Sequence, residues 1–265
     1  EKMFGEGGVQ VKQWDKEVRS DFAIYTQVNL ETIEKENKDS NKIVKPQQTL
    51  QMQGNVILKT AQGIVNSDNI ILDLMKKHAI LEGLDTSKEG RIRIEVNLTD
   101  LEKKRVEKKT DSESQNNIET ISQNSEPTQV LILASRAVLD NSKHQAMFEG
   151  DVEMERTPGN LYIHAGKITL HLNESHELQF IQAAQEVCFE QPGRVAKSDQ
   201  ASFDEITKTI LLEGKAEVQS GQYHLQGNSI NLYLDVNKGI AQGDNKAPIQ
   251  MTVLGEQEPA IFACR

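Results

Sequence analysis

Alternating apolar and polar residues from Ala137 to Met154 form the clearest pattern in the chain. Apolar side chains occupy every second position on both sides of a polar cluster, Asp140 to Lys143. A period of two is typical of a strand with one buried face, and the polar cluster has the composition of a turn. The segment therefore predicts a β-hairpin, and Gly150 in its second strand predicts a bulge, a kink or a close backbone approach.

This hairpin pattern recurs with a fixed spacing between an aspartate and a glycine. The pairs are Asp73 with Gly83, Asp140 with Gly150, and Asp204 with Gly214, each ten residues apart. Looser copies run from Asp21 to Gly54 and from Leu232 to Gly243, and a degraded copy runs from Ile168 to Val187. Repetition of one supersecondary unit indicates a repeat architecture.

Short strand patterns separated by turn residues cover most of the remaining chain. The predicted strands are Val9 to Trp14, Phe22 to Ile33, Leu50 to Leu58, Ile64 to Leu74, Ala79 to Gly83, Arg91 to Val96, Leu131 to Leu139, Ala146 to Met154, Leu161 to Leu172, Leu178 to Phe189, Ala201 to Phe203, Ile210 to Val218, Tyr223 to Leu234 and Ile249 to Val253. No segment has the periodicity of a helix of three turns. The pattern predicts an all-β fold, as an antiparallel sandwich, barrel or solenoid.

Two polar segments interrupt the pattern. Residues 34–48 are mostly charged or amide-bearing and predict a loop, and residues 97–129 predict a disordered insertion because they hold few large aliphatic side chains. The basic run from Lys103 to Lys109 is expected to be a solvated surface, and Gly5 to Gly8 a flexible start. We divide the chain into N-terminal strands with a polar insertion (1–49), a β-domain interrupted by the second insertion (50–253) and a C-terminal tail (254–265).

Composition and charge narrow the function classes. The net charge of −10 over 265 residues argues against nucleic-acid binding, which needs a basic surface. The hydrophobic fraction of 37% and aromatic fraction of 5% fit strands that bury one face. No apolar run approaches the roughly 18 residues of a membrane-spanning helix. Because the sequence begins at Glu1, we expect any cleaved export signal to have been removed already.

The two cysteines, Cys188 and Cys264, allow one disulfide but no four-cysteine zinc site. Cys188 lies between Val187 and Phe189 in an apolar run, so a buried free thiol is the expectation there. Cysteine usage leaves the redox compartment open.

The repeated acidic residues are the first candidates for catalysis. Asp73, Asp140 and Asp204 share one place in the repeat, but an aspartate at the mouth of a turn is expected to accept backbone hydrogen bonds. Glu82, Glu149 and Glu213 each precede the repeat glycine, on the outward side of the alternation. Two of these glutamates could in principle act as the paired carboxylates of a glycosidase. We expect them instead to be outward-facing charges that keep the surface soluble.

Other chemistry is not apparent in the sequence. The histidines are His78, His144, His164, His171, His176 and His224, and only His164 and His171 are even loosely spaced as metal ligands. No glycine-rich phosphate loop or nucleophile elbow occurs. We expect no catalytic residue, no metal site and no cofactor.

The inward side of the predicted strands supplies an aliphatic surface. Its members are Ile70, Leu72, Leu74, Leu81, Leu139, Phe148, Val152, Met154, Ile168, Leu170, Leu172, Leu212, Val218, Ile230, Leu232 and Leu234. An ordinary packed core accounts for most of these residues. A sandwich that stays open along one side would instead present this surface as a trough for lipid.

The repeat resembles the OstA-like domain of the LptA family of lipopolysaccharide-transport proteins. The matching residues run from Leu139-Asp140 to Val152 and from Phe203-Asp204 to Val218, each followed by an I-x-L-x-L strand, Ile168 to Leu172 and Ile230 to Leu234. Leu72-Asp73 to Gly83 matches less fully. The resemblance covers about residues 50–96 and 130–253. The two insertions and the long N-terminal portion are atypical of the compact family member. The chain could therefore be the bridging protein itself or a relative of it fused to an extra segment.

The resemblance implies a twisted, open antiparallel β-jellyroll of two sheets in a V. It also implies a periplasmic location, acyl chains of lipid A held against the aliphatic set above except Leu81, and head-to-tail homo-oligomers that join membrane-anchored OstA-like partners. The main hypothesis is a non-enzymatic lipopolysaccharide carrier between two membranes. A structural or adaptor β-repeat protein of the cell envelope is the alternative, and an enzyme acting on polysaccharide is the third. For oligomers, the expected pairing edges are Val9 to Trp14 or Phe22 to Ile33 and Ile249 to Val253.

Overall fold

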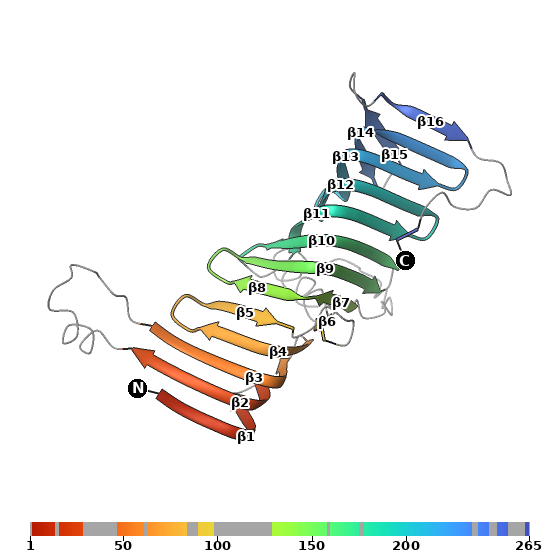
Figure 1. Cartoon of the computed structure of the whole chain (residues 1–265). Coiled ribbons are helices and arrows are strands. Elements are labelled where there is room, and N and C mark those ends of the chain that lie inside the picture. The colour runs from red at the N-terminus through yellow and green to blue at the C-terminus, as the bar shows by residue number, and fades with distance from the viewer. Residues whose placement is uncertain are drawn as a thin grey trace, which may run out of the picture.

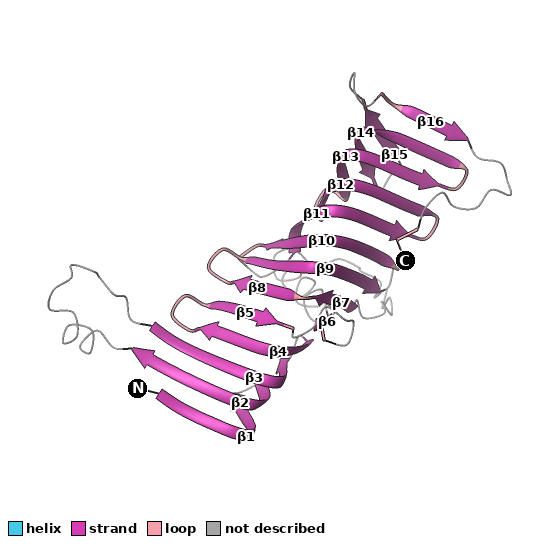
Figure 2. Ribbon diagram, in the orientation of Figure 1, coloured by secondary structure: helices cyan, strands magenta, loops and turns pink. Residues whose placement is uncertain are grey.

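The computed structural model describes residues 2–13, 16–28, 47–60, 63–83, 90–97, 129–157, 160–174, 178–234, 238–243, 248–253 and 263–264. All its elements are strands (Figures 1 and 2): β1 Lys2–Gln13, β2 Lys16–Val28, β3 Gln47–Thr60, β4 Gly63–Asp73, β5 His78–Glu82, β6 Ile92–Asn97, β7 Gln129–Ala134, β8 Arg136–Asp140, β9 Gln145–Thr157, β10 Leu161–Leu172, β11 Leu178–Gln191, β12 Arg194–Asp204, β13 Thr209–Ser220, β14 Tyr223–Tyr233, β15 Lys238–Gln242 and β16 Gln250–Val253. The all-β prediction is confirmed. Nowhere in these ranges is there a helix long and apolar enough to cross a membrane.

The strands form one antiparallel sheet of 16 strands in which most sequence neighbours pair directly. β5 and β6 pair with the two halves of β4, β7 and β8 pair with the two halves of β9, and β15 and β16 pair with the two halves of β14. Each such pair takes the place of one long strand. The sheet is therefore an up-and-down meander that starts at β1 and ends at β15 and β16 without closing, and these edges lie at opposite ends of the elongated molecule (Figure 1).

The long strands bend at bulges near their middle. Register shifts fall between Gln53 and Val56 in β3 and between Glu213 and Ala216 in β13, with equivalent shifts in the neighbouring strands. Gly54, Gly150 and Gly214 lie at these bulges with φ of 73°, 82° and 73°, so the predicted bulge is confirmed. Bulges in adjacent strands define a line, called the fold line here, along which the sheet bends into two facing halves. The two layers are thus halves of one continuous sheet.

This geometry explains the spacing between aspartate and glycine in the repeat. Asp73, Asp140 and Asp204 each end a strand and precede a four-residue turn. The following half-strand runs from the turn back to the fold line, where Gly150 and Gly214 lie. Gly83 takes the equivalent place in the first copy, but there β5 ends at Glu82 and the next strand, β6, begins at Ile92. Ten residues are therefore one turn plus one half-strand.

Several predicted boundaries are wrong. Gly5 to Gly8, expected to be flexible, belong to β1, where positive φ at Gly7 and Gly8 allows a bulge. The strand predicted from Leu131 to Leu139 is two strands that meet at Ser135, and the strand predicted at Ala201 extends over all of β12. Most of the two predicted polar insertions, residues 34–46 and 98–128, lies outside the described residues. The basic run from Lys103 to Lys109 is part of the second of these segments. β2 and β3 pair directly, so strands on both sides of residue 49 share one sheet.

Candidate functional site

The space between the two halves of the sheet is the candidate site. The pairing register aligns inward residues in rows that cross the strands. On one half, the row next to the fold line contains Ala23, Met52, Ile70, Leu81, Ala137, Phe148, Ile168, Ala183, Ala201, Leu212 and Ile230. All are buried except Ala201, which is half-buried. The next row outward contains Leu50, Leu72, Ala79, Leu139, Ala146, Leu170, Ile181, Phe203, Ile210 and Leu232. These rows give the interior a continuous apolar lining.

Burial along the outer row changes from one end of the molecule to the other. Toward the N-terminal end, Leu50, Leu72 and Leu139 are half-buried. Toward the C-terminal end, Ile210 and Leu232 are 2% and 4% exposed, while Leu170 and Phe203 of the same row are half-buried. On the opposite half, Leu58 and Val65 are half-buried toward the N-terminal end, and Leu225 is half-buried at the C-terminal end. The members between them that are buried are Ile94, Ile132, Met154, Ile163, Phe189 and Val218. The interior is therefore most open to solvent over β2–β5 and β8, and side chains fill it most completely over β11 and β13.

The structure brings nearly all of the predicted aliphatic set into this interior. Ile70, Leu81, Phe148, Val152, Met154, Ile168, Leu212, Val218, Ile230 and Leu232 are buried in one hydrophobic cluster, and Leu72, Leu139, Leu170 and Leu234 pack against it half-buried. Leu172 is half-buried at the end of β10. Leu74 is the correction: it lies in the turn after β4 and is 46% exposed, because its strand has already ended at Asp73.

Sequence reasoning left out part of the lining. Met52, Ile94, Ile132, Ile163, Phe189 and Ile210 are buried inward residues that the predicted set lacks. Each lies in a run with alternating apolar residues, so continuing the alternation through β3, β6 and β7 would have found most of them. The opposing half of each bent strand was harder to assign because a bulge shifts the alternation at the fold line.

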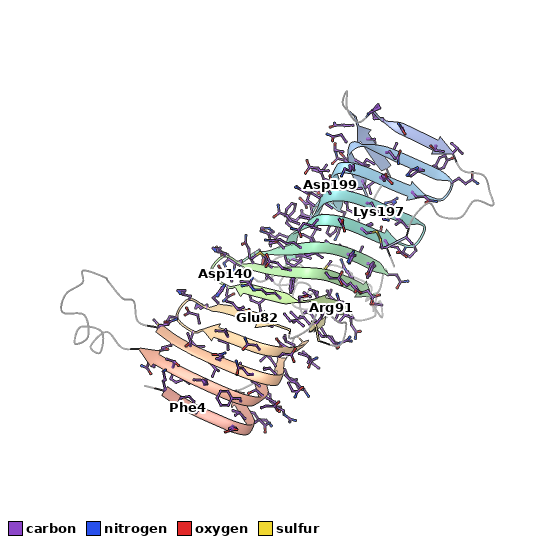
Figure 3. The ribbon with its side chains drawn as sticks, in the orientation of Figure 1. Phe4, Glu82, Arg91, Asp140, Lys197 and Asp199 are labelled. Atoms are coloured by element: carbon purple, nitrogen blue, oxygen red, sulfur yellow. A yellow bond between two sulfur atoms is a disulfide. The ribbon has the colours of Figure 1, made fainter. Side chains whose placement is uncertain are left out.

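The repeated aspartates cap the turns, as expected. Asp140 Oδ1 accepts hydrogen bonds from the Ser142 hydroxyl at 2.6 Å and from the backbone N–H groups of Ser142 and Lys143, both at 3.1 Å. Asp73 and Asp204 accept equivalent backbone bonds. These bonds favour the charged carboxylate and hold the pKa of all three below the ordinary aspartate value, most strongly at Asp140, where the Ser142 hydroxyl is the largest cause. Asp140 lies at a hairpin turn in Figure 3.

The glutamates that precede the repeat glycine form ion pairs across the outer face. Glu149 contacts Arg136 at 3.1 Å and Lys167 at 3.0 Å, and the hydrogen bond from Lys167 is the first cause of its lowered pKa. Glu82 lies 3.9 Å from Arg136, and Glu213 is exposed. Strand pairing places these side chains on the face opposite the apolar rows, which matches the expected surface charges. Of the residues that the structure describes, no group of histidine, cysteine and acidic side chains could hold a metal ion.

Arg91 is a buried charge that sequence reasoning did not single out. It lies where the chain returns to the sheet before β6, and its side chain is 0% exposed. Its guanidinium donates to the backbone oxygen and the carboxylate of Asp151 and to Glu153 Oε1 at 2.5 Å. Asp151 follows Gly150 at the fold line and also lies 2.7 Å from His164. Arg91 therefore ties the returning chain to the bulge of β9.

The expected free thiol at Cys188 is wrong, because Cys188 and Cys264 form a disulfide. Val187 and Phe189 point into the interior, so the alternation sends Cys188 to the outer face, where it is only 5% exposed. The link brings residue 264 back from the C-terminal edge to β11. Beside Cys264, a hollow of about 370 Å³ is lined by Leu131, Leu133, Glu153, Glu155, Tyr162 and His164.

The two ends of the sheet expose apolar side chains. Met3 and Phe4 on β1 are 56% and 68% exposed, and Figure 3 shows Phe4 on this terminal strand. At the other end, Met251 and Val253 on β16 are each 63% exposed. Unpaired edge strands with apolar side chains favour pairing with another chain.

One family model matches part of this chain. Residues 131–238, from β7 to the start of β15, match the family model described as "LptA/(LptD N-terminal domain) LPS transport protein". One similar solved structure is LptH, the LptA-homologous periplasmic component of the lipopolysaccharide transport device from Pseudomonas aeruginosa, with 16% sequence identity and a TM-score of 0.43. The similarity covers 48% of this chain and 95% of that one. Comparison with curated proteins yields no match.

The family match lies on the strands that carry two of the repeats, Asp140 to Gly150 and Asp204 to Gly214. The resemblance seen in the sequence is therefore confirmed, and it rests on the C-terminal part of the sheet. Residues 131–238 of this chain are thus similar to the OstA-like domain of lipopolysaccharide-transport proteins.

Proposed function

We propose that this protein is a non-enzymatic carrier that holds the acyl chains of lipopolysaccharide in the interior of its folded sheet. The observation that carries the proposal is the continuous apolar lining, which is half-buried at Leu50, Leu72 and Leu139. A partly open apolar trough shields aliphatic chains from water and leaves a polar headgroup outside. The acidic residues of the repeat support this choice over an enzyme, because they serve turns and surface ion pairs.

The same proposal includes a place and partners for the chain. A carrier of this kind works in the periplasm between two membranes, and its exposed edges at β1 and at β15 and β16 would pair head to tail with copies of itself or with membrane-anchored OstA-like proteins. Antiparallel addition of a strand to an unpaired edge satisfies its free N–H and C=O groups. Contact between two different edges does not close on itself, so it gives rods of variable length.

Photo-crosslinking at neighbouring positions tests lipid binding. A photoreactive residue at Leu170 faces the interior, whereas one at Thr169 on the same strand faces outward, and both native side chains are half-buried. The carrier proposal predicts capture of lipopolysaccharide from position 170 and not from position 169. Equal capture from both positions, or none from Leu170 and from Leu72, would contradict it.

The adaptor alternative has one observation in its favour. Leu212, Ile230 and Leu232 are almost fully buried by protein, so this part of the interior, over β13 and β14, has little room for a ligand. In an adaptor, this packing would extend along the whole molecule. Failure of every inward position to capture lipid would favour that alternative.

A further inference from the structure

One ion pair joins the two free margins of the folded sheet. The ends of β3, β9, β11 and β13 form one margin of the folded sheet, called the far rim here. Arg156 lies on this rim, one residue before the end of β9. Glu205 opens the turn after β12, at the opposite margin formed by the turns after β4, β8 and β12, called the hairpin rim. Arg156 Nη1 lies 3.8 Å from Glu205 Oε2. Because the strands bend at the fold line between these rims, the contact spans the mouth of the interior.

The ion pair lies where the interior changes from open to closed. Beyond it toward the C-terminal end, Ile210, Val218 and Leu232 are 2%, 6% and 4% exposed, although Leu225 is half-buried. Before it toward the N-terminal end, Leu72 and Leu139 are half-buried. The position of the contact and the change in burial are separate observations, and the contact lies between the half-buried residues of β4 and β8 and the buried residues of β13.

The contact has the chemistry of an exchangeable anion site. Its 3.8 Å separation is longer than a hydrogen bond, and among the described residues Glu205 Oε2 is buried without a hydrogen-bond donor. Lys208, in the same turn, donates to the other oxygen of Glu205. A carboxylate thus sits between a guanidinium and an ammonium group, and a phosphate oxygen would make shorter, charge-assisted bonds to the same two cations.

We propose that Arg156, Glu205 and Lys208 form a clasp that keeps the C-terminal part of the interior shut until a phosphate group of an amphiphile replaces the Glu205 carboxylate. The inference rests on the proposed function, because the amphiphile is the lipid held in the interior. Its acyl chains enter the open N-terminal part, and its headgroup meets Arg156 and Lys208 at the rims. Displacing Glu205 separates the rims and extends the trough toward β14.

The first arm of the test needs no lipid. Cysteines introduced at exposed Thr157 and Ile206, beside Arg156 and Glu205, take spin labels selectively because Cys188 and Cys264 are already bonded to each other. Electron–electron spin distances in the unloaded protein should lengthen and broaden in Glu205→Gln and in Arg156→Gln. Glu95→Gln and Arg93→Gln are matched controls, since they break an ion pair of 2.6 Å on β6 that does not join the rims. Unchanged distances in both clasp variants would overturn the inference.

The second arm compares lipid A with the same lipid after enzymatic removal of its phosphates. Native protein should bind the phosphorylated form more tightly by about five-fold, the size of one partly exposed charged contact, and binding should lengthen the spin distance. Arg156→Gln should remove the preference, and Glu205→Gln should strengthen binding of the phosphorylated form. Equal affinity for both lipids with an unchanged distance would overturn the clasp alone. Failure to bind either lipid would overturn the proposed function and the clasp with it.

Discussion

At the residue scale, the repeated acidic side chains maintain the fold. Asp73, Asp140 and Asp204 each accept backbone hydrogen bonds in a turn, and Lys77, His144 and Lys208 end those turns with positive φ. The three turns differ in sequence but share one requirement, an aspartate oxygen that accepts hydrogen bonds from two backbone N–H groups. Their lowered pKa values are a consequence of turn geometry, and catalysis is not needed to explain them.

Asp140 should make stability depend on pH in one direction. Its pKa is lower in the folded protein than in the unfolded chain, so its contribution is present above the ordinary aspartate pKa of roughly 4 and is lost as pH falls through the folded value. Asp140→Ala should lower Tm at neutral pH, with the difference from the native protein shrinking in acid. Thermal unfolding followed by circular dichroism between neutral and acidic pH measures this.

Asp140→Asn is the matched variant for that experiment. It retains an oxygen that can accept the turn hydrogen bonds but cannot carry charge, so its Tm deficit should be smaller at neutral pH. A deficit of Asp140→Ala that stays constant across the whole pH range would contradict the assigned role of the charge.

At the element scale, the bent strand is the unit of the molecule. Gly150 has φ of 82°, and a Cβ built on it would lie 2.7 Å from Ser135 Cβ. Gly214 is equivalent, with a Cβ 2.9 Å from Asp199 Cβ. Glycine is therefore needed at the fold line for two reasons, backbone conformation and the close approach of the next strand.

Replacing Gly150 by alanine should destabilise the fold by about 2–4 kcal/mol, because strain in the left-handed region adds to a steric clash. Gly193→Ala is the control, since Gly193 has φ of 77° but nothing within 4 Å of its Cβ position. This control should cost only about 1 kcal/mol. Urea unfolding at equilibrium measures both variants. Equal losses would show that the fold line has no special steric requirement at Gly150.

Sequence alternation correctly predicted the inward residues on one side of the fold line. Alternation placed Ile70, Phe148 and Leu212 on the inward face, and the repeat glycines marked the bulges. It did not reveal that each long strand crosses both layers, because the bulge resets the alternation. Cys188 was misassigned because an apolar run does not show which face each residue takes, and its partner Cys264 is 76 residues away. Arg91 and the rim contact of Arg156 depend on tertiary geometry that local patterns do not contain.

At the scale of the whole molecule, the sheet is a long folded ribbon with two free edges. β1 and β16 lie at opposite ends, and neither edge is covered in the described part of the chain (Figure 1). The interior runs between these ends, so copies joined edge to edge would align their interiors into one longer trough.

Charge on the C-terminal edge should prevent assembly. Met251→Lys with Val253→Lys places two cations on exposed positions of β16 and should shift concentration-dependent oligomers to monomers without loss of fold. Ile206→Lys is the control, because Ile206 is 76% exposed but lies in the turn after β12. Substitution is preferable to deleting residues 248–265, since deletion would leave Cys188 unpaired. Sedimentation velocity that shows a native monomer at every concentration would contradict edge pairing.

The most direct test of the carrier account is lipopolysaccharide binding by two adjacent variants of β4. Leu72 faces the interior and Ile71 faces outward, and both side chains are half-buried. Leu72→Glu puts a charge in the apolar trough and should weaken binding at least about ten-fold, while Ile71→Glu, with a comparable effect on Tm, should leave the affinity unchanged. Equal affinities of the two variants for lipopolysaccharide, with both proteins folded, would contradict binding in the interior.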